Sequence, residues 1–151
     1  MNRDTHFFQL VAGLFRQEFM RCDLSRAPAS LPYFPKGCCN WASYMIGHYL
    51  KFERNMEPKE VIGTRQDETG SVSHSWLRVN QTIIDITSDQ FSDSITPVIV
   101  GQLSYWHQNW EFLEENKILP IIQYDGIETP TQIKPSEVYE ILAKPIRSQF
   151  A

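Results

Sequence analysis

The chain has 151 residues, of which 42% are hydrophobic, and its formal net charge is −4. This length and composition fit one folded domain over residues 1–151 and exclude a disordered chain. No basic block indicates nucleic-acid or anionic-membrane binding, and no apolar run is long enough to cross a bilayer, so we expect neither partner.

The three cysteines, Cys22, Cys38 and Cys39, are too few and too unevenly spaced for a disulfide framework. Adjacent cysteines bridge only with strained geometry. We therefore expect free thiols and a cytoplasmic, reducing environment. The polar N-terminus does not resemble a secretory signal, although export by a specialised machine would leave no such mark.

The first elements are predicted to be helices. Apolar residues at helical spacing predict a helix from Asp4 to about Leu24. Three prolines between residues 28 and 35 then predict an ordered loop. An apolar stripe predicts a second helix over residues 38–53. Asn55-Met56 and then Pro58 mark its end.

The pattern then changes to strands. Residues 61–65 form a candidate strand before a polar loop, and residues 74–79 and 82–87 read as a hairpin with a tight turn at Asn80-Gln81. A two-residue turn places one set of side chains on the core face of this hairpin: Leu77, Val79, Ile84 and Ile86. The remaining elements are weaker strands at 97–100 and 118–123, a short helix at 106–116 and a terminal helix at 135–143. This order predicts an α+β fold with N-terminal helices packed on an antiparallel β-sheet.

Gly37-Cys38-Cys39 lies at the expected start of the second helix. Free backbone N–H groups and the helix dipole lower the pKa of a thiol at such a position and favour its reactive thiolate. The same N–H groups could hold an oxyanion. The alternative is that both cysteines pack as small buried apolar residues.

The same hairpin turn places His74, Trp76, Asp85 and Thr87 on one face. Asp85 becomes a diagonal neighbour of His74, roughly 7–8 Å away between backbones and within side-chain reach. A carboxylate there can orient an imidazole as a catalytic triad requires. Asp85 could instead cap a turn or pair with Arg78, and one more residue in the turn would reverse the faces.

Three motifs carry a family resemblance: Gly37-Cys38-Cys39-Asn40-Trp41-Ala42-Ser43, Ser73-His74-Ser75-Trp76 and Ile84-Asp85-Ile86-Thr87. In this order they resemble the transglutaminase-like branch of the papain-like cysteine enzymes, over residues 34–91. The resemblance implies a papain-like/transglutaminase-like fold with Cys39 as nucleophile, His74 as base and Asp85 as the acid. Cys38 stays open as an alternative nucleophile, and Trp76 is a candidate substrate contact. The glutamine that papain-type enzymes carry before the cysteine is missing from residues 32–34, which leaves the oxyanion hole unassigned.

These residues predict a cysteine hydrolase or acyltransferase acting on an amide. The resemblance implies that the amide belongs to a protein or peptide, so that the enzyme would be a peptidase, amidase or glutamine deamidase. No cofactor or metal is expected. Zinc binding by Cys38, Cys39 and His74 is disfavoured because adjacent cysteines do not make a Cys-x-x-Cys site. His107, like the other two histidines, is expected to be an ordinary surface or core residue. The alternatives are a non-catalytic binding module on the same fold and a toxin-like effector deamidase.

Overall fold

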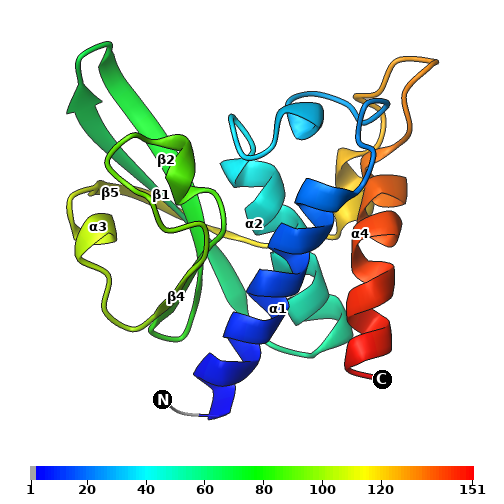
Figure 1. Cartoon of the computed structure of the whole chain (residues 1–151), viewed down its shortest axis with the longest axis horizontal. Coiled ribbons are helices and arrows are strands. Elements are labelled where there is room, and N and C mark those ends of the chain that lie inside the picture. The colour runs from blue at the N-terminus through cyan, green and yellow to red at the C-terminus, as the bar shows by residue number, and fades with distance from the viewer. Residues whose placement is uncertain (1–2) are drawn as a thin grey trace.

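A computed structural model describes residues 3–151 and shows helices packed against one face of a twisted antiparallel sheet (Figure 1). The predicted α+β class is confirmed. No helix in the described part of the chain is long and apolar enough to cross a membrane.

Three helices form the helical layer: α1 (Arg3–Arg21), α2 (Cys39–His48) and α4 (Pro135–Gln149). The chain continues from α2 into a single π-helical turn at Tyr49–Glu53. The first, second and last of the predicted helices are therefore confirmed, but α4 is longer than expected and runs through Pro145. Pro145 removes one backbone hydrogen bond from the helix. Leu142, Ala143 and Ile146, which flank it in sequence, pack into the core and compensate for that loss.

The sheet has five strands in the order β4-β3-β2-β1-β5. Their bounds are β1 (Pro58–Asp67), β2 (Gly70–Val79), β3 (Thr82–Asp85), β4 (Ile99–Gly101) and β5 (Glu111–Lys117). Val79 pairs with Thr82 and Leu77 with Ile84, which confirms the two-residue turn and its register. Asn80, the first turn residue, has a φ of 54°, a left-handed conformation that asparagine tolerates.

Two sequence predictions in the C-terminal half are wrong. The expected helix at 106–116 is only the short α3 (Tyr105–Gln108), and the chain then enters β5. β5 is an edge strand exposed along nearly its whole length, so it shows no apolar alternation, and only pairing with β1 makes it a strand. The expected strand at 118–123 contains the short 3-10 helix η4 (Ile121–Tyr124), with Ile118 and Ile121 buried.

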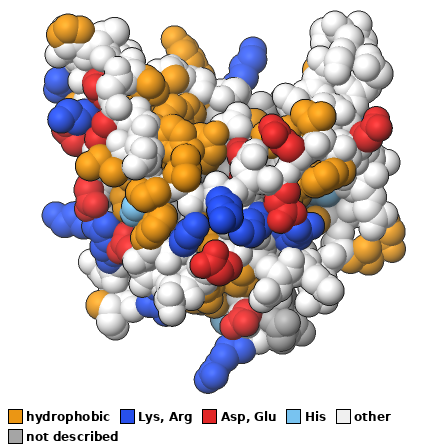
Figure 2. All heavy atoms as spheres, turned by 180° about the vertical axis from the view of Figure 1, so that it is seen from behind, with side chains coloured by type: hydrophobic (Ala, Val, Ile, Leu, Met, Phe, Trp, Pro, Cys, Tyr) orange, Lys and Arg blue, Asp and Glu red, His pale blue; other side chains and the backbone are white. Residues whose placement is uncertain are grey.

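The sheet buries side chains on both faces. The main core lies between the sheet and the helices, and a smaller cluster on the other face contains Val61, Trp76 and Trp110. Phe91 and Trp106 from the segment between β3 and β5 pack against this smaller cluster. Figure 2 shows the molecule from behind, where apolar side chains gather on the half away from the β1–β2 hairpin and acidic and basic groups mix across the middle.

Candidate Cys-His-Asp site

Cys39 is the first residue of α2, and its side chain is partly exposed. The first hydrogen bond of the helix runs from the N–H of Ala42 to the carbonyl of Cys38, at 2.8 Å. The N–H groups of Cys39 and of the next two residues therefore lie outside the helical ladder and point out of its N-terminus. The preceding turn requires Gly37, whose φ is +68°.

The structure separates the two adjacent cysteines. Cys38 is fully buried, and its thiol donates a hydrogen bond to the carbonyl of Ser30 at 3.0 Å. Burial raises the pKa of Cys38 to about 11. Burial acts against the Cys39 thiolate as well, but contacts with His74 and Ser75 outweigh it and lower the pKa of Cys39 below its usual value. Of the pair, Cys39 is thus the thiol whose pKa His74 lowers.

His74 lies in β2 and is 1% exposed. Its Nε2 is 2.7 Å from Oδ2 of Asp85, whereas its Nδ1 is buried without a hydrogen-bond partner in the described structure. An ionised carboxylate only accepts, so Nε2 donates to Asp85, and Nδ1 is the nitrogen left to take up or release a second proton. Burial disfavours the imidazolium, but the charge of Asp85 and the contact with Cys39 raise the pKa of His74 to about 9.

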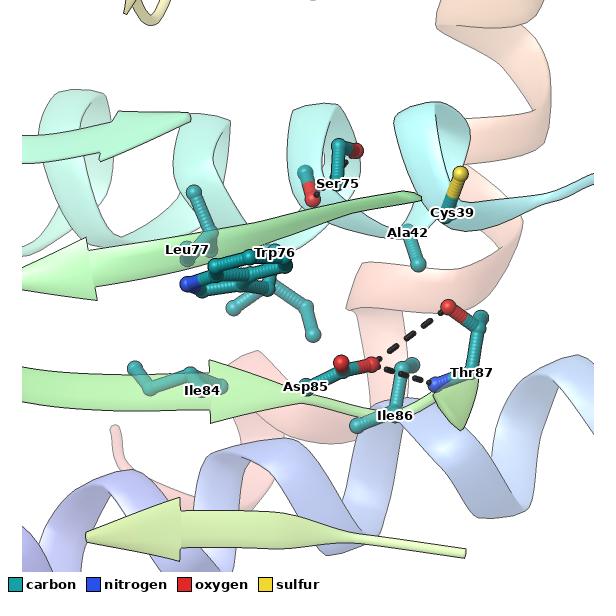
Figure 3. Close-up of a pocket in the computed structure, with 11 residues that line it drawn as sticks. Cys39, Ala42, Ser75, Trp76, Leu77, Ile84, Asp85, Ile86 and Thr87 are labelled. Carbon is teal, nitrogen blue, oxygen red and sulfur yellow. Dashed lines mark hydrogen bonds between the residues drawn. The ribbon is translucent and has the colours of Figure 1, made fainter. Parts of the chain in front are cut away.

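Asp85 ends β3 and is buried. Its Oδ1 accepts hydrogen bonds from the backbone N–H of Thr87 at 2.9 Å and from the Thr87 hydroxyl at 3.4 Å (Figure 3). Burial alone would raise the pKa of Asp85, but the two histidines that contact it, His74 and His107, hold that pKa well below its usual range. Arg78, the alternative partner, bonds to Glu115 instead.

His107 is the functional candidate that sequence reasoning missed. Its Nε2 lies 2.6 Å from the same Asp85 Oδ2 that contacts His74, and its Nδ1 lies 2.5 Å from the hydroxyl of Ser104. Ser104 is the N-cap of α3 and also accepts from the backbone N–H of His107. This capping pattern is the local signal in the sequence, and it does not reveal a contact with a residue 22 positions away.

Aromatic rings enclose His74. The centroids of Phe91, Trp106, Trp110 and Trp76 lie 5.1–5.7 Å from the imidazole centroid. Trp76, the candidate substrate contact, is 7% exposed and packs against both histidines. Such an enclosure excludes water and strengthens the electrostatic interactions inside it.

The side chains of Gln90 and Arg16 hold the loops of the site together. The Gln90 amide accepts from the N–H of Gly37 and donates to the carbonyl of Thr87, both at 3.1 Å, which links the cysteine turn to the end of β3. Arg16 of α1 bonds both carboxylate oxygens of Asp89 and the carbonyl of Ile86. Between α2 and the sheet, a cavity of about 10 Å³ reaches Cys39, Asp85 and Thr87, room for about one water (Figure 3).

Within residues 3–151, His74, Asp85 and His107 form the one group of ligand-type side chains that could hold a metal ion, with ligand atoms within 4.8 Å of one another. Their N···O separations of 2.6–2.7 Å are hydrogen-bond distances. Two ligands each about 2 Å from a tetrahedral ion lie about 3.3 Å apart. The observed spacing fits a proton network better than a metal site.

No family model matches this chain, and searches of curated proteins and of solved structures gave no significant match. The fold and the site together define an α+β protein in which a helix-start thiol, a buried imidazole and a buried carboxylate meet. Its function follows from what this geometry can do chemically.

Proposed function

We propose that this chain is a cysteine-dependent hydrolase or acyltransferase acting on an amide of a protein or peptide. Cys39 is the nucleophile, His74 the base and Asp85 the residue that orients the base. The observation that carries the proposal is the His74 ring. Its Nε2 is bound to a buried carboxylate, and its unpaired Nδ1 belongs to a ring that interacts with a thiol of lowered pKa.

The arrangement of elements supports a papain-like/transglutaminase-like fold as part of this proposal. The thiol opens a helix packed against an antiparallel sheet, and adjacent strands of that sheet carry the histidine and the aspartate. This order and placement resemble those of the transglutaminase-like branch. The short β2–β3 hairpin makes the chain a minimal version of such a fold.

The chemistry proceeds in two halves. His74 Nδ1 takes the Cys39 proton, and the thiolate attacks the amide carbonyl, whose oxygen becomes negative. The N–H groups at the start of α2 stabilise that oxygen. His74 then donates its proton to the leaving amine, which departs as a thioester forms. Attack on this thioester by water gives an acid, and attack by a second amine gives a new amide, each step regenerating the thiol.

The charge of Asp85 explains how the thiolate forms. Burial disfavours charged groups, but Asp85 stabilises the His74 imidazolium, so the charged pair of Cys39 thiolate and His74 imidazolium is favoured over the neutral pair. The carbonyl must reach Cys39 from the partly exposed N-terminus of α2, because aromatic rings close the other side of His74.

The first test is the pH dependence of iodoacetamide alkylation, with the modified cysteine assigned by mass spectrometry. We expect Cys39 to react with a midpoint below the ordinary thiol value of about 8.5. His74→Ala should remove this low midpoint, whereas Cys38→Ser, the matched control, should retain it. Alkylation of Cys39 only at alkaline pH, unaffected by His74→Ala, would refute the thiolate–imidazolium pair.

The second test identifies the reaction. Wild type and Cys39→Ala are incubated with a panel of glutamine-containing proteins and peptides, with and without a fluorescent primary amine. Ammonia release alone indicates deamidation, amine incorporation indicates acyl transfer, and new termini indicate peptide cleavage. If Cys39 is reactive but all three readouts match Cys39→Ala across the panel, a binding module becomes the better explanation.

A further inference from the structure

The carboxylate of Asp85 has more partners than orienting one histidine requires. Oδ2 contacts Nε2 of both His74 and His107, and the two imidazole rings are 6.4 Å apart between centroids. His107 is 4% exposed and lies in α3, a segment the sheet does not need for its own hydrogen bonding. Its side chain is therefore placed by its contacts with Asp85 and Ser104.

We infer that His107 is a positioning residue of the proposed site, which acts on Cys39 through Asp85 and His74. It holds the shared carboxylate oxygen at one place and keeps it ionised, so that the proton on His74 stays on Nε2. The catalytic role of His107 rests on the proposed function, but the effect of His107 on Asp85, His74 and Cys39 can be tested without a substrate.

The hydrogen bonds at His107 fix which nitrogen carries its proton. The ionised Asp85 can only accept, so Nε2 of His107 donates to it. The Ser104 hydroxyl donates to Nδ1, while its oxygen accepts from the backbone N–H of His107 at 3.3 Å. Both histidines thus carry a proton on Nε2, and a chain of contacts runs from Ser104 through Asp85 to Cys39.

A second donor matters because Asp85 is the last residue of β3 and its side chain has no cationic lysine or arginine partner among the described residues. With His74 and Thr87 alone, a buried carboxylate could rotate or take up a proton. His107 supplies the donor that opposes both. The groups that face His74 are Cys39 from α2, Asp85 from β3 and His107 from α3, with Arg65 of β1 stacked beyond the Trp110 ring.

Two variants of His107 separate positioning from packing. His107→Phe keeps a ring but removes the donor, and we expect the Cys39 alkylation midpoint to rise by about one pH unit, equal to about tenfold less thiolate below the midpoint. His107→Gln can still donate to Asp85, and it should recover most of the wild-type midpoint. A purely structural role would lower the stability of both variants and leave the midpoint of each unchanged.

The wild-type protein provides a test that does not depend on any variant folding. Nitrogen-15 NMR should show two slowly exchanging Nε2–H protons, one on each histidine. A His107 ring that lacks this Nε2 proton, or that exchanges it rapidly, overturns the inference.

The outcomes distinguish this inference from the proposed function. A high Cys39 midpoint in wild type rejects the proposed function while the NMR result still decides the His107 contact. A low wild-type midpoint that His107→Phe leaves unchanged rejects the positioning role alone. Stoichiometric zinc or iron in the purified protein, lost in His107→Phe, would show that the three side chains bind a metal, which also overturns the inference.

Discussion

At the residue scale, the chemistry of this protein depends on which atoms of a few buried side chains carry protons. Asp85 acts on Cys39 indirectly, because it contacts Nε2 of His74 rather than the thiol. Its charge stabilises the imidazolium and keeps a proton on Nε2, so that Nδ1 is the nitrogen without a hydrogen-bond partner on the ring that interacts with the thiol.

Replacing Asp85 by Asn tests this dependence. An Asn side chain fills the same space without the charge and can present an N–H to His74, which would move the ring proton to Nδ1. We expect the pKa of His74 to fall and Cys39 alkylation at pH 6 to slow by about tenfold or more. The measurement is the alkylation rate across pH.

The matched control for this substitution is Asp89→Asn. Asp89 lies four residues further along the chain and pairs with Arg16 instead of a histidine. Its replacement should leave the Cys39 midpoint in place. Equal effects of both substitutions would mean that general loosening of the segment, rather than the charge on His74, controls the thiol.

At the scale of elements, a glycine in β1 makes room for the aromatic rings that surround His74. Gly63 pairs with His74, and the β1–β5 register shifts between Ile62 and Gly63. A Cβ at Gly63 would lie 2.8 Å from Cβ of Trp110 and 2.9 Å from the Trp76 ring. The missing side chain is what allows two tryptophans to approach the strand at this point.

We therefore expect Gly63→Ala to displace these rings and destabilise the protein by about 1–3 kcal/mol, the usual cost of overpacking a core. Urea unfolding followed by tryptophan fluorescence measures it. Gly13→Ala is the control, because a Cβ there meets no atom within 4 Å and alanine favours the helix interior. A Gly63→Ala protein as stable as wild type would contradict the close approach.

At the scale of the whole molecule, the buried charges link stability to pH. The pKa of His74 is about 9 in the folded protein and about 6.5 in an unfolded chain. Because the folded value is the higher one, the charged imidazole contributes stability that is fully present below about pH 6.5. That contribution is lost as the pH rises through about 9.

The test uses the Cys39→Ser background, which removes a thiol whose titration has the opposite sign. We expect the free energy of unfolding of Cys39→Ser to decrease between pH 6.5 and 9.5, and Cys39→Ser/His74→Gln to show a clearly smaller decrease. Denaturant unfolding at several pH values gives both curves. Parallel curves would show that His74 is not held in its charged form by the fold.

The sequence by itself determined the features that depend on neighbouring residues. Apolar periodicity predicted the first, second and last helices, and the two-residue turn at Asn80-Gln81 set the β2–β3 register. Because strand side chains alternate, that register was enough to place His74 and Asp85 on one face.

Only the tertiary structure decided the contacts between distant or adjacent residues. Helical phase cannot separate Cys38 from Cys39, whereas packing buries the first and leaves the second partly exposed, with its pKa lowered by His74. β5 is a strand because β1 pairs with it, since its own exposed residues carry no apolar pattern. His107 contacts Asp85 although the two residues lie 22 positions apart in the sequence. No local sequence pattern predicts a contact over that separation, so it follows from the packing of the chain alone.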